Sequence, residues 1–231
     1  MLSLLVALSG YVLKERVDGD TQITYVSLEG VRMDFPAKRT SLILTLEDGK
    51  PKAYMLNHDE RTYSDLSSMA STLGSMYFAM FVRCESGGGN CDVDTSAIKP
   101  TDEYKVINGR RARKVIYYTR NLKYLLGANA QAIPDSIENW FVRDWRPLVM
   151  AEMTRMRFLS EYSSRALNSP EVKGILRRLE DYLSGVFSKY GAPISTVSPF
   201  MGRVLRTTRF YAARADIPED KFGIPEGYRR K

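Results

Sequence analysis

The chain has 231 residues, of which 44% are apolar and 26% are charged, and its formal net charge is +7. A chain of this length and composition can bury a core of its own, which excludes a protein that is disordered throughout. The positive charge favours an anionic partner such as nucleic acid, lipid headgroups or an acidic protein. However, the basic residues are dispersed along the chain, a pattern more typical of a solvated cationic surface.

The first ten residues are apolar and allow two interpretations. They have the length of the apolar part of a secretory signal, but no basic residues precede them. They are also far shorter than the ~20 residues that span a bilayer. They are therefore either the tail of a truncated or mis-started export signal or the start of a buried strand. We expect an exported protein, periplasmic or otherwise extracytoplasmic.

The pattern from residue 11 to residue 63 predicts a meander of antiparallel strands. β-Branched and aromatic residues alternate with polar ones, and turn residues separate the runs. The clearest turn is Asp48-Gly49, because this pair readily adopts the left-handed conformations of a tight hairpin. The expected strands are residues 11–17, 21–28, 31–35, 40–46, 52–57 and 61–63.

An amphipathic helix is predicted next, with apolar residues from Leu66 to Phe81 at helical spacing. Cys84 and Cys91 follow and bracket a glycine-rich loop. In an oxidising compartment they would close a small ring, stabilising the fold by roughly 2–3 kcal/mol. The alternative is two unrelated free thiols. Their spacing does not match a zinc site, so we expect no metal.

The second half of the chain mixes strands and helices. Strands at 103–107 and 113–119 flank Asn108-Gly109, a second hairpin signal, and a further strand is expected at 140–142. Helices are expected at 148–166 and at 170–190, where Ser169 caps the second helix and Gly191 ends it. The remaining expected strands are 194–197, 203–213 and 222–228. We expect a single domain over residues 1–231, with a helical insertion around 147–190.

The sequence offers no catalytic constellation. His58 is the only histidine, and no Gly-x-Ser-x-Gly nucleophile motif accompanies it, so we expect it in an exposed turn. The glycines at 87–89 lack the Lys-Ser/Thr of a phosphate loop, and no dinucleotide-binding motif is present. We therefore expect a protein that is not an enzyme and has no cofactor.

Methionines on two helical stretches are the best candidates for a binding site. Thioether side chains adapt to irregular apolar shapes, which suits a cavity for a lipid or another hydrophobic ligand. The alternative is that they fill an ordinary core between sheet and helices. The candidate ligand-binding residues are Met69, Leu73, Met76, Met80, Met150 and Met153.

Single-stranded nucleic acid is a less favoured partner. Tyr117 and Tyr118 lie beside Arg113, Lys114 and Arg120, and aromatic residues flanked by cations can stack on bases. Tyrosine is also a normal strand residue, and no recognised nucleic-acid module is present. We expect no nucleic-acid partner.

Several short motifs resemble the LolA/LppX-like superfamily of lipoprotein and lipid carriers, and more narrowly an uncharacterised bacterial branch with that fold. They are Val-Arg-Met-Asp at 31–34, Ala-Tyr-Met-Leu-Asn at 53–57, Arg-Thr-Tyr at 61–63, Val-Ile-Asn-Gly-Arg at 106–110, Trp140 and Phe-Gly-Ile-Pro at 222–225. The resemblance implies an α+β fold: a strongly curved antiparallel sheet, an open half-barrel, with helices packed on its concave face. The extra helix between Leu148 and Tyr190 departs from the family and could fill the hollow.

Together these features predict a non-enzymatic cell-envelope protein. Its ligand would be a lipid or a lipoprotein acyl chain, bound in the hollow of the curved sheet. The further partners considered are an anionic membrane surface and an envelope protein. The alternative is a protein–protein interaction module on the same scaffold without a ligand cavity, followed by a basic nucleic-acid-binding protein.

Overall fold

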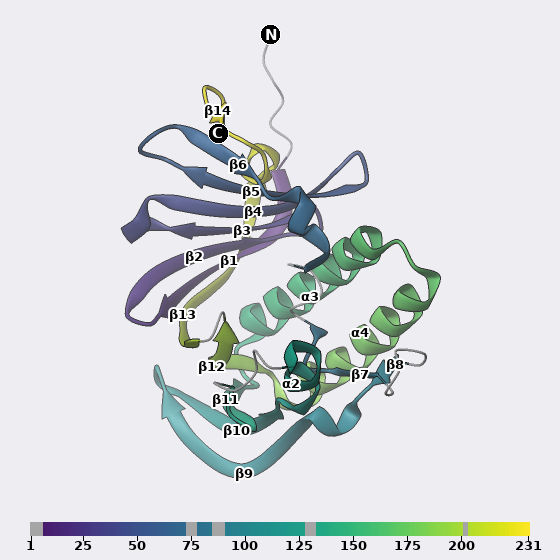
Figure 1. Ribbon diagram of the computed structural model, residues 1–231. Helices are drawn as coiled ribbons and strands as arrows, with labels where there is room; N and C mark the ends of the chain where they lie inside the picture. The colour runs from purple at the N-terminus through teal and green to yellow at the C-terminus, as the bar shows by residue number, and fades with distance from the viewer. Residues whose placement is uncertain (1–6, 73–77, 85–90, 128–132, 201–202) are drawn as a thin grey trace.

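A single curved sheet organises the molecule (Figure 1). The computed structural model describes residues 7–72, 78–84, 91–127, 133–200 and 203–231. In this part of the chain, 12 strands form the sheet in the order β14-β6-β5-β4-β3-β2-β1-β13-β12-β11-β10-β9. Its two edge strands, β14 and β9, do not pair with each other, so the sheet is open.

The first arm of the sheet is the predicted meander. Its strands are β1 (Ala7–Val17), β2 (Asp20–Val26), β3 (Gly30–Phe35), β4 (Thr40–Glu47), β5 (Lys50–Asn57) and β6 (Thr62–Asp65), with the 3-10 turn η1 (Pro36–Lys38) between β3 and β4. Asp48 and Gly49 have φ angles of 49° and 73°. Glu47 pairs with Lys50 across them, which confirms the predicted two-residue hairpin.

The second arm is also a meander. Its strands are β9 (Ile98–Ile107), β10 (Arg110–Tyr118), β11 (Ser136–Val142), β12 (Ala192–Phe200) and β13 (Arg203–Pro218). The turn between β9 and β10 is at Asn108 and Gly109, with φ angles of 50° and 73°, as the sequence predicts. β9 begins five residues before the predicted start at Glu103.

The pairing of β1 with β13 joins the two arms. It extends from Ala7 opposite Pro218 to Val17 opposite Thr207, with a bulge between Lys14 and Glu15. Residues 7–10 therefore belong to a strand, as the second of the two interpretations of this stretch predicted. Residues 1–6 lie outside the described part of the chain. A bulge bends a strand locally, and this one lies where the sheet turns from one arm to the other.

Two long helices, α3 (Arg146–Leu167) and α4 (Pro170–Tyr190), lie between β11 and β12 in sequence. α3 ends at Asn168 in the left-handed conformation, and the Ser169 hydroxyl then accepts a hydrogen bond from the Val172 amide to begin α4. Gly191 ends α4 at φ 87°, where a Cβ atom would lie 2.0 Å from the Val142 carbonyl oxygen. The two predicted helices are thereby confirmed.

Shorter helical elements precede the two long helices in the chain. They are η2 (Ser67–Met69), η3 (Thr95–Ala97) and α2 (Arg120–Leu126). Residues 70–72 and 78 are helical, as the predicted amphipathic helix requires. The middle of that helix, residues 73–77, lies outside the described residues.

Figure 1 shows α3 and α4 inside the curve of the sheet. α3 crosses the concave face, where Met156, Phe158 and Tyr162 are 0–1% exposed. Leu179 and Leu183 of α4, also 0–1% exposed, belong to the same core cluster. The predicted fold class, a curved open antiparallel sheet with helices on its concave face, is therefore confirmed.

The last residues, 219–231, cross the opposite, convex face and are called here the C-terminal segment. It comprises η5 (Glu219–Phe222) and β14 (Arg229–Arg230), which pairs in parallel with β6. The predicted strand at 222–228 is wrong, because Phe222 ends a 3-10 helix and Glu226 and Gly227 fall in a turn. Ile224 and Tyr228 instead pack on a second small core formed by Ile43, Tyr54 and Leu56.

Candidate binding sites

The hollow of the sheet is occupied by the protein's own side chains. The large core cluster joins Val31, Leu44 and Ala53 of the first arm to Val115 and Phe141 of the second. The buried residues of α3 and α4 lie between the arms in the same cluster. Where the structure is described, a ligand under the sheet would therefore have to displace packed core residues.

The candidate methionines lie in different surroundings. Met69 in η2 is 44% exposed, whereas Met80 and Met153 are partly buried against the large core. Met150 is half-buried on the first turns of α3. Leu73 and Met76 lie outside the described residues. A cavity lined by these six residues stays a prediction.

An open groove lies between α4 and the beginning of β9, with a volume of about 390 Å³. Tyr182, Val186 and Tyr190 follow one another at intervals of four residues along α4 and form one wall with Gly185. Ile98 and Pro100 of β9 contribute the other apolar surface, and Asp181 and Lys189 complete the lining. The Tyr182 hydroxyl donates a hydrogen bond of 2.7 Å to the Thr95 carbonyl, which fixes this ring.

Cations stack on the tyrosine at one end of the groove. The Arg113 guanidinium lies 5.3 Å from the Tyr190 ring centre, and the Lys189 ammonium lies 5.2 Å from it. In the sequence, Val186 and Tyr190 belong only to the helix expected at 170–190. The four-residue spacing of Tyr182, Val186 and Tyr190 could have indicated one wall of the groove. The other wall could not be predicted, because Ile98 and Pro100 lie before the expected start of the strand at Glu103.

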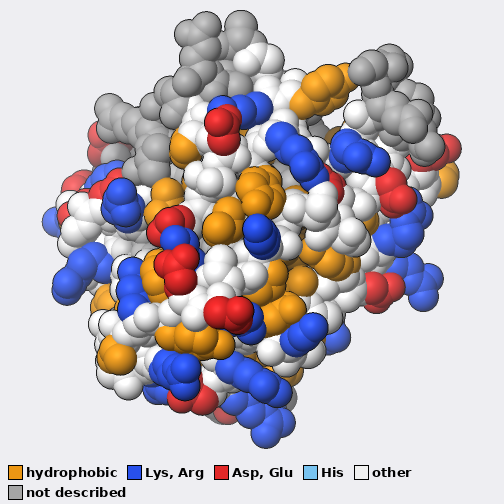
Figure 2. All heavy atoms as spheres, turned by 90° about the horizontal axis from the view of Figure 1, so that it is seen from below, with side chains coloured by type: hydrophobic (Ala, Val, Ile, Leu, Met, Phe, Trp, Pro, Cys, Tyr) orange, Lys and Arg blue, Asp and Glu red, His pale blue; other side chains and the backbone are white. Residues whose placement is uncertain are grey.

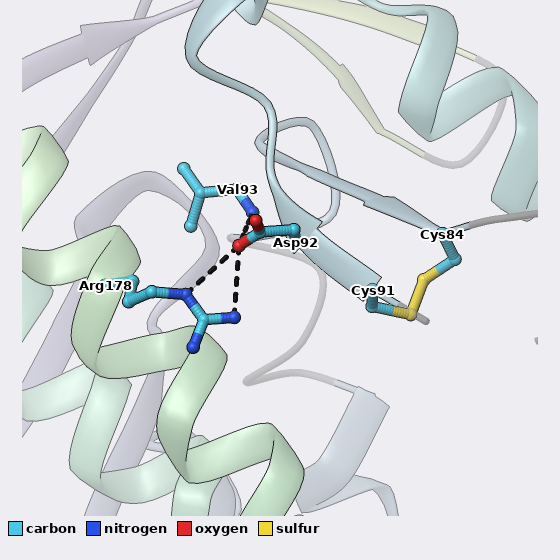
Figure 3. The surroundings of a disulfide bond; sticks show 5 residues. All are labelled: Cys84, Cys91, Asp92, Val93 and Arg178. Carbon is cyan, nitrogen blue, oxygen red and sulfur yellow. Dashed lines mark hydrogen bonds and ion pairs between the residues drawn. A yellow bond between two sulfur atoms is a disulfide. The ribbon is translucent and has the colours of Figure 1, made fainter. Parts of the chain in front are cut away.

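The disulfide predicted from the sequence joins Cys84 and Cys91. It links β7 (Val82–Cys84) to β8 (Cys91–Val93), a two-stranded sheet separate from the large one. Figure 3 shows Asp92 of this small sheet beside Arg178 of α4, with Arg178 Nε and a terminal nitrogen 3.1 and 3.0 Å from Asp92 Oδ1. Hydrogen bonds from the Val93 amide and from Arg178 lower the pKa of Asp92. The ion pair therefore attaches the disulfide-linked strands to α4.

Asp94, just after β8, is a buried carboxylate with several donors. Arg120 lies 2.7 Å from one of its oxygens, and Asn121 donates to the same oxygen at 3.0 Å. Burial alone would raise the pKa of Asp94, but hydrogen bonds from Ser96, Asn121 and Arg120 hold it well below its usual range. These bonds tie η3 and α2 together next to the groove.

A network of four charged residues, three of them buried and Arg155 partly buried, lies between α3 and the sheet. Arg209 of β13 is 2.9 Å from Glu15 and 3.2 Å from Glu152, and Glu152 is 2.5 Å from Arg155. Thr24 also donates to Glu15 at 2.8 Å. Burial would raise the pKa of Glu15, but the positive charges of Arg209 and Arg155 lower it. An ionic network at this position does not suit a hollow for an acyl chain.

His58 is not the exposed turn histidine that the sequence predicts. It is half-buried, with Nε2 2.7 Å from Ser41 Oγ and Nδ1 2.6 Å from the Tyr228 hydroxyl. Ser41 donates to Asp34 at 2.6 Å, and Asp34 lies 2.6 Å from Arg32. Burial and the positive charge of Arg32 lower the pKa of His58. The serine thus lies between the carboxylate and the imidazole, whereas in a hydrolase triad the imidazole lies between the other two.

Metal ligands and membrane spans complete the description of the candidate sites. Within the described ranges, no group of three or more His, Cys, Asp or Glu side chains is placed to hold a metal ion. Among the same residues, no helix combines the length and the apolar character needed to cross a membrane.

No family model matches the chain. An uncharacterised protein from Aquifex aeolicus (strain VF5) is 23% identical over 231 residues, covering 95% of this chain and 80% of that protein.

The solved structures with similar folds are distant. A structure of PNGF-II has a TM-score of 0.36 at 9% identity. The match covers 96% of this chain but only 31% of PNGF-II, so this chain spans about a third of that protein. An uncharacterised conserved protein from Thermus thermophilus has a TM-score of 0.36 at 7% identity, covering 99% and 91% of the two chains. The Mycobacterium tuberculosis lipoprotein LppX has a TM-score of 0.32 at 9% identity, covering 87% and 85%. At these TM-scores, none of the three supports an assignment of function.

Proposed function

We propose that this chain is a non-catalytic protein of the cell envelope that binds an apolar ligand, a lipid or a lipoprotein acyl chain, in the groove between α4 and β9. The observation that carries the proposal is the groove itself, about 390 Å³ in volume and lined mainly by Ile98, Pro100, Tyr182, Val186 and Tyr190. Concave, largely apolar surfaces with a few polar groups at the rim are typical of ligand sites. The sequence predicts a ligand in the hollow of the sheet, but α3 and α4 occupy that space, so we propose the groove instead.

The arrangement around His58 supports a structural role for this histidine rather than a catalytic one. Ser41, whose hydroxyl lies 2.7 Å from the imidazole, is 0% exposed. A substrate could not reach its oxygen without displacing the C-terminal segment, which contributes Tyr228 to the same network. The simplest account of these hydrogen bonds is that they attach that segment to the sheet.

The disulfide supports an extracytoplasmic location. Disulfides such as Cys84–Cys91 persist in oxidising compartments and are rare where thiols are kept reduced. The periplasm is the compartment that fits a bacterial carrier of lipid or lipoprotein.

Native mass spectrometry of freshly purified protein, followed by organic extraction and lipid analysis, tests the ligand. We expect an adduct of lipid mass that dissociates on denaturation. A clean mass of the apoprotein, unchanged after incubation with mixed lipids, would contradict the proposal.

Two glycines of α4 provide a matched test of the site. A Cβ atom at Gly185 would meet no heavy atom within 4 Å, so Gly185→Phe should place a ring in the groove without a backbone clash. Gly174→Phe makes the same substitution on the same helix outside the groove. We expect loss of the lipid adduct in Gly185→Phe alone. Equal lipid binding by the two variants would show that the groove is not the binding site.

An interaction module of the envelope, with no ligand, is the second candidate. The observation that favours it is β9, an edge strand whose Tyr104 and Val106 are 45% and 72% exposed while the concave face is filled. An exposed strand edge can pair with another chain. A stable protein partner recovered together with a clean apoprotein mass would favour this function over the first.

A further inference from the structure

The end of the β9–β10 hairpin carries positive charge that is not balanced by carboxylates. Residues 104–111 read Tyr-Lys-Val-Ile-Asn-Gly-Arg-Arg and contain three cations and no anion. None of the ion pairs between described residues involves Lys105, Arg110 or Arg111. Farther from the turn, the pattern differs, because Arg113 pairs with Asp102 at 2.8 Å and Lys114 with Glu103 at 3.2 Å. The unpaired charge is therefore concentrated at the end of the hairpin.

Aromatic rings hold the three cations in place. The Lys105 ammonium lies 4.0 Å from the centre of the Trp140 ring. The Arg110 guanidinium lies 4.6 Å from the Trp145 ring, and that of Arg111 lies 4.2 Å from the Tyr104 ring. Each cation thus rests on an apolar ring, so that the end of the hairpin presents charge and apolar surface together.

Apolar side chains are exposed beside Arg111, whereas Lys105 and Arg110 lie on the other face of the hairpin. Val106 is 72% exposed and lies directly opposite Arg111 in the pairing of β9 with β10. Tyr104 is 45% exposed on the same face of β9, two residues before Val106. Figure 2, which views the molecule from below, shows hydrophobic side chains interspersed with Lys and Arg and also with Asp and Glu. This combination of aliphatic, aromatic and cationic groups matches the interface of an anionic bilayer, where apolar groups enter below the phosphates.

We propose that the end of the β9–β10 hairpin, formed by Tyr104, Lys105, Val106, Arg110 and Arg111, docks on a membrane surface that carries anionic phospholipids. The end of the hairpin would meet the headgroup region with both of its faces, Tyr104, Val106 and Arg111 on one and Lys105 and Arg110 on the other. The three cations would then meet lipid phosphates. The two-residue turn and the stacked rings hold these groups in one arrangement, which lowers the entropic cost of docking.

Docking at this end would also place the proposed groove near the bilayer. Ile98 and Pro100 line the groove at the beginning of β9, and Val106 lies near its other end. Six residues of strand span about 20 Å. The membrane proposal goes beyond the groove and does not require it, because the hairpin end and the groove share none of their lining residues.

Co-sedimentation of the full chain with vesicles tests the proposal. The vesicles contain phosphatidylcholine alone or with increasing phosphatidylglycerol. We expect binding to rise with the anionic fraction and to fall with salt, because salt screens the attraction. Each Lys or Arg near such a surface strengthens binding by about fivefold. The triple variant Lys105→Gln, Arg110→Gln, Arg111→Gln should therefore bind about 100-fold more weakly.

A second triple variant controls for net charge. Lys38→Gln, Lys173→Gln and Arg177→Gln remove three exposed cations from η1 and from the first turns of α4. We expect this variant to bind within about threefold of the unmodified protein. Equal loss in the two triple variants would mean that overall charge drives binding and would overturn the hairpin assignment. Absence of vesicle binding at low salt would overturn the whole proposal.

Val106→Asp provides a test that does not rely on removing cations. Because Val106 is 72% exposed, the substitution should leave the melting temperature unchanged. We expect about tenfold weaker vesicle binding, whereas unchanged binding would contradict docking by this residue. Tighter binding to a single-stranded oligonucleotide or to an acidic protein than to vesicles would identify a different partner. The hairpin variants should still show any lipid adduct in native mass spectra, because their substitutions lie outside the groove. Failure of the membrane proposal is therefore distinguishable from failure of the groove as a ligand site.

Discussion

Phe222 lies directly against Gly30, so that a Cβ atom on Gly30 would come within 2.6 Å of Phe222 Cδ1. Gly30 begins β3, and Phe222, which is 4% exposed, ends η5 in the C-terminal segment. The absence of a side chain at residue 30 is therefore what allows the segment to pack on the convex face.

Gly30→Ala should destabilise the protein because the Phe222 ring would have to move. Phe222→Ala should lower the free energy of unfolding by about 3 kcal/mol, since it empties a buried position. In the double variant, the alanine at residue 30 no longer meets the ring, so the combined loss should be smaller than the sum of the two. Urea unfolding of the four proteins measures this coupling. Strict additivity would show that the Leu44 carbonyl, 3.0 Å from the same Cβ position, dominates instead.

His58 should make stability depend on pH. Its pKa in the folded protein is lowered by burial and by Arg32, so the unfolded chain takes up the proton first as the pH falls. The free energy of unfolding should therefore decrease below the ordinary histidine pKa of about 6.5 and level off below the folded value. Because His58 is the only histidine, His58→Gln should remove this component, which lies below about pH 6.5. The free energy of unfolding is measured by urea unfolding at several pH values. The same pH dependence in His58→Gln and the unmodified protein would contradict the prediction.

Arg209→Met should be among the most damaging single substitutions. Arg209 lies between Glu15 and Glu152, which are both 1% exposed, and its removal leaves two buried carboxylates facing each other. Breaking a buried ion pair in this way costs about 3–5 kcal/mol. Arg214→Met, on the same strand but exposed, is the matched control and should cost less than about 0.5 kcal/mol. Similar unfolding curves for the two variants would show that the network contributes little.

Removal of the disulfide should lower the free energy of unfolding measurably but leave the protein folded. The loop between Cys84 and Cys91 is short, so the loop-entropy model gives a loss of about 2–3 kcal/mol for the double Cys→Ser variant. The Asp92–Arg178 ion pair still attaches β8 to α4, so the rest of the fold should persist. Thermal unfolding with and without reductant checks this: reductant should lower the melting temperature of the unmodified protein and not that of the variant.

Local sequence chemistry predicted much of the fold. Asp48-Gly49 and Asn108-Gly109 specify tight hairpins because both residues of each pair adopt positive φ angles at low cost. Ser169 and Pro170 mark the start of α4 in a similar way. Such signals depend on a residue and its immediate neighbours, and therefore a single sequence contains them.

The sequence by itself determined most strands of both arms, the two long helices and the excess positive charge, and it indicated that Cys84 and Cys91 could pair. Only the tertiary structure decided what lies on each face of the sheet. It filled the concave face with α3 and α4 and placed Glu15, Arg209 and Glu152 together from three separate elements. It also laid the C-terminal segment over His58 and Ser41. These contacts join residues far apart in the chain, and their energies depend on packing and burial, which no local pattern records.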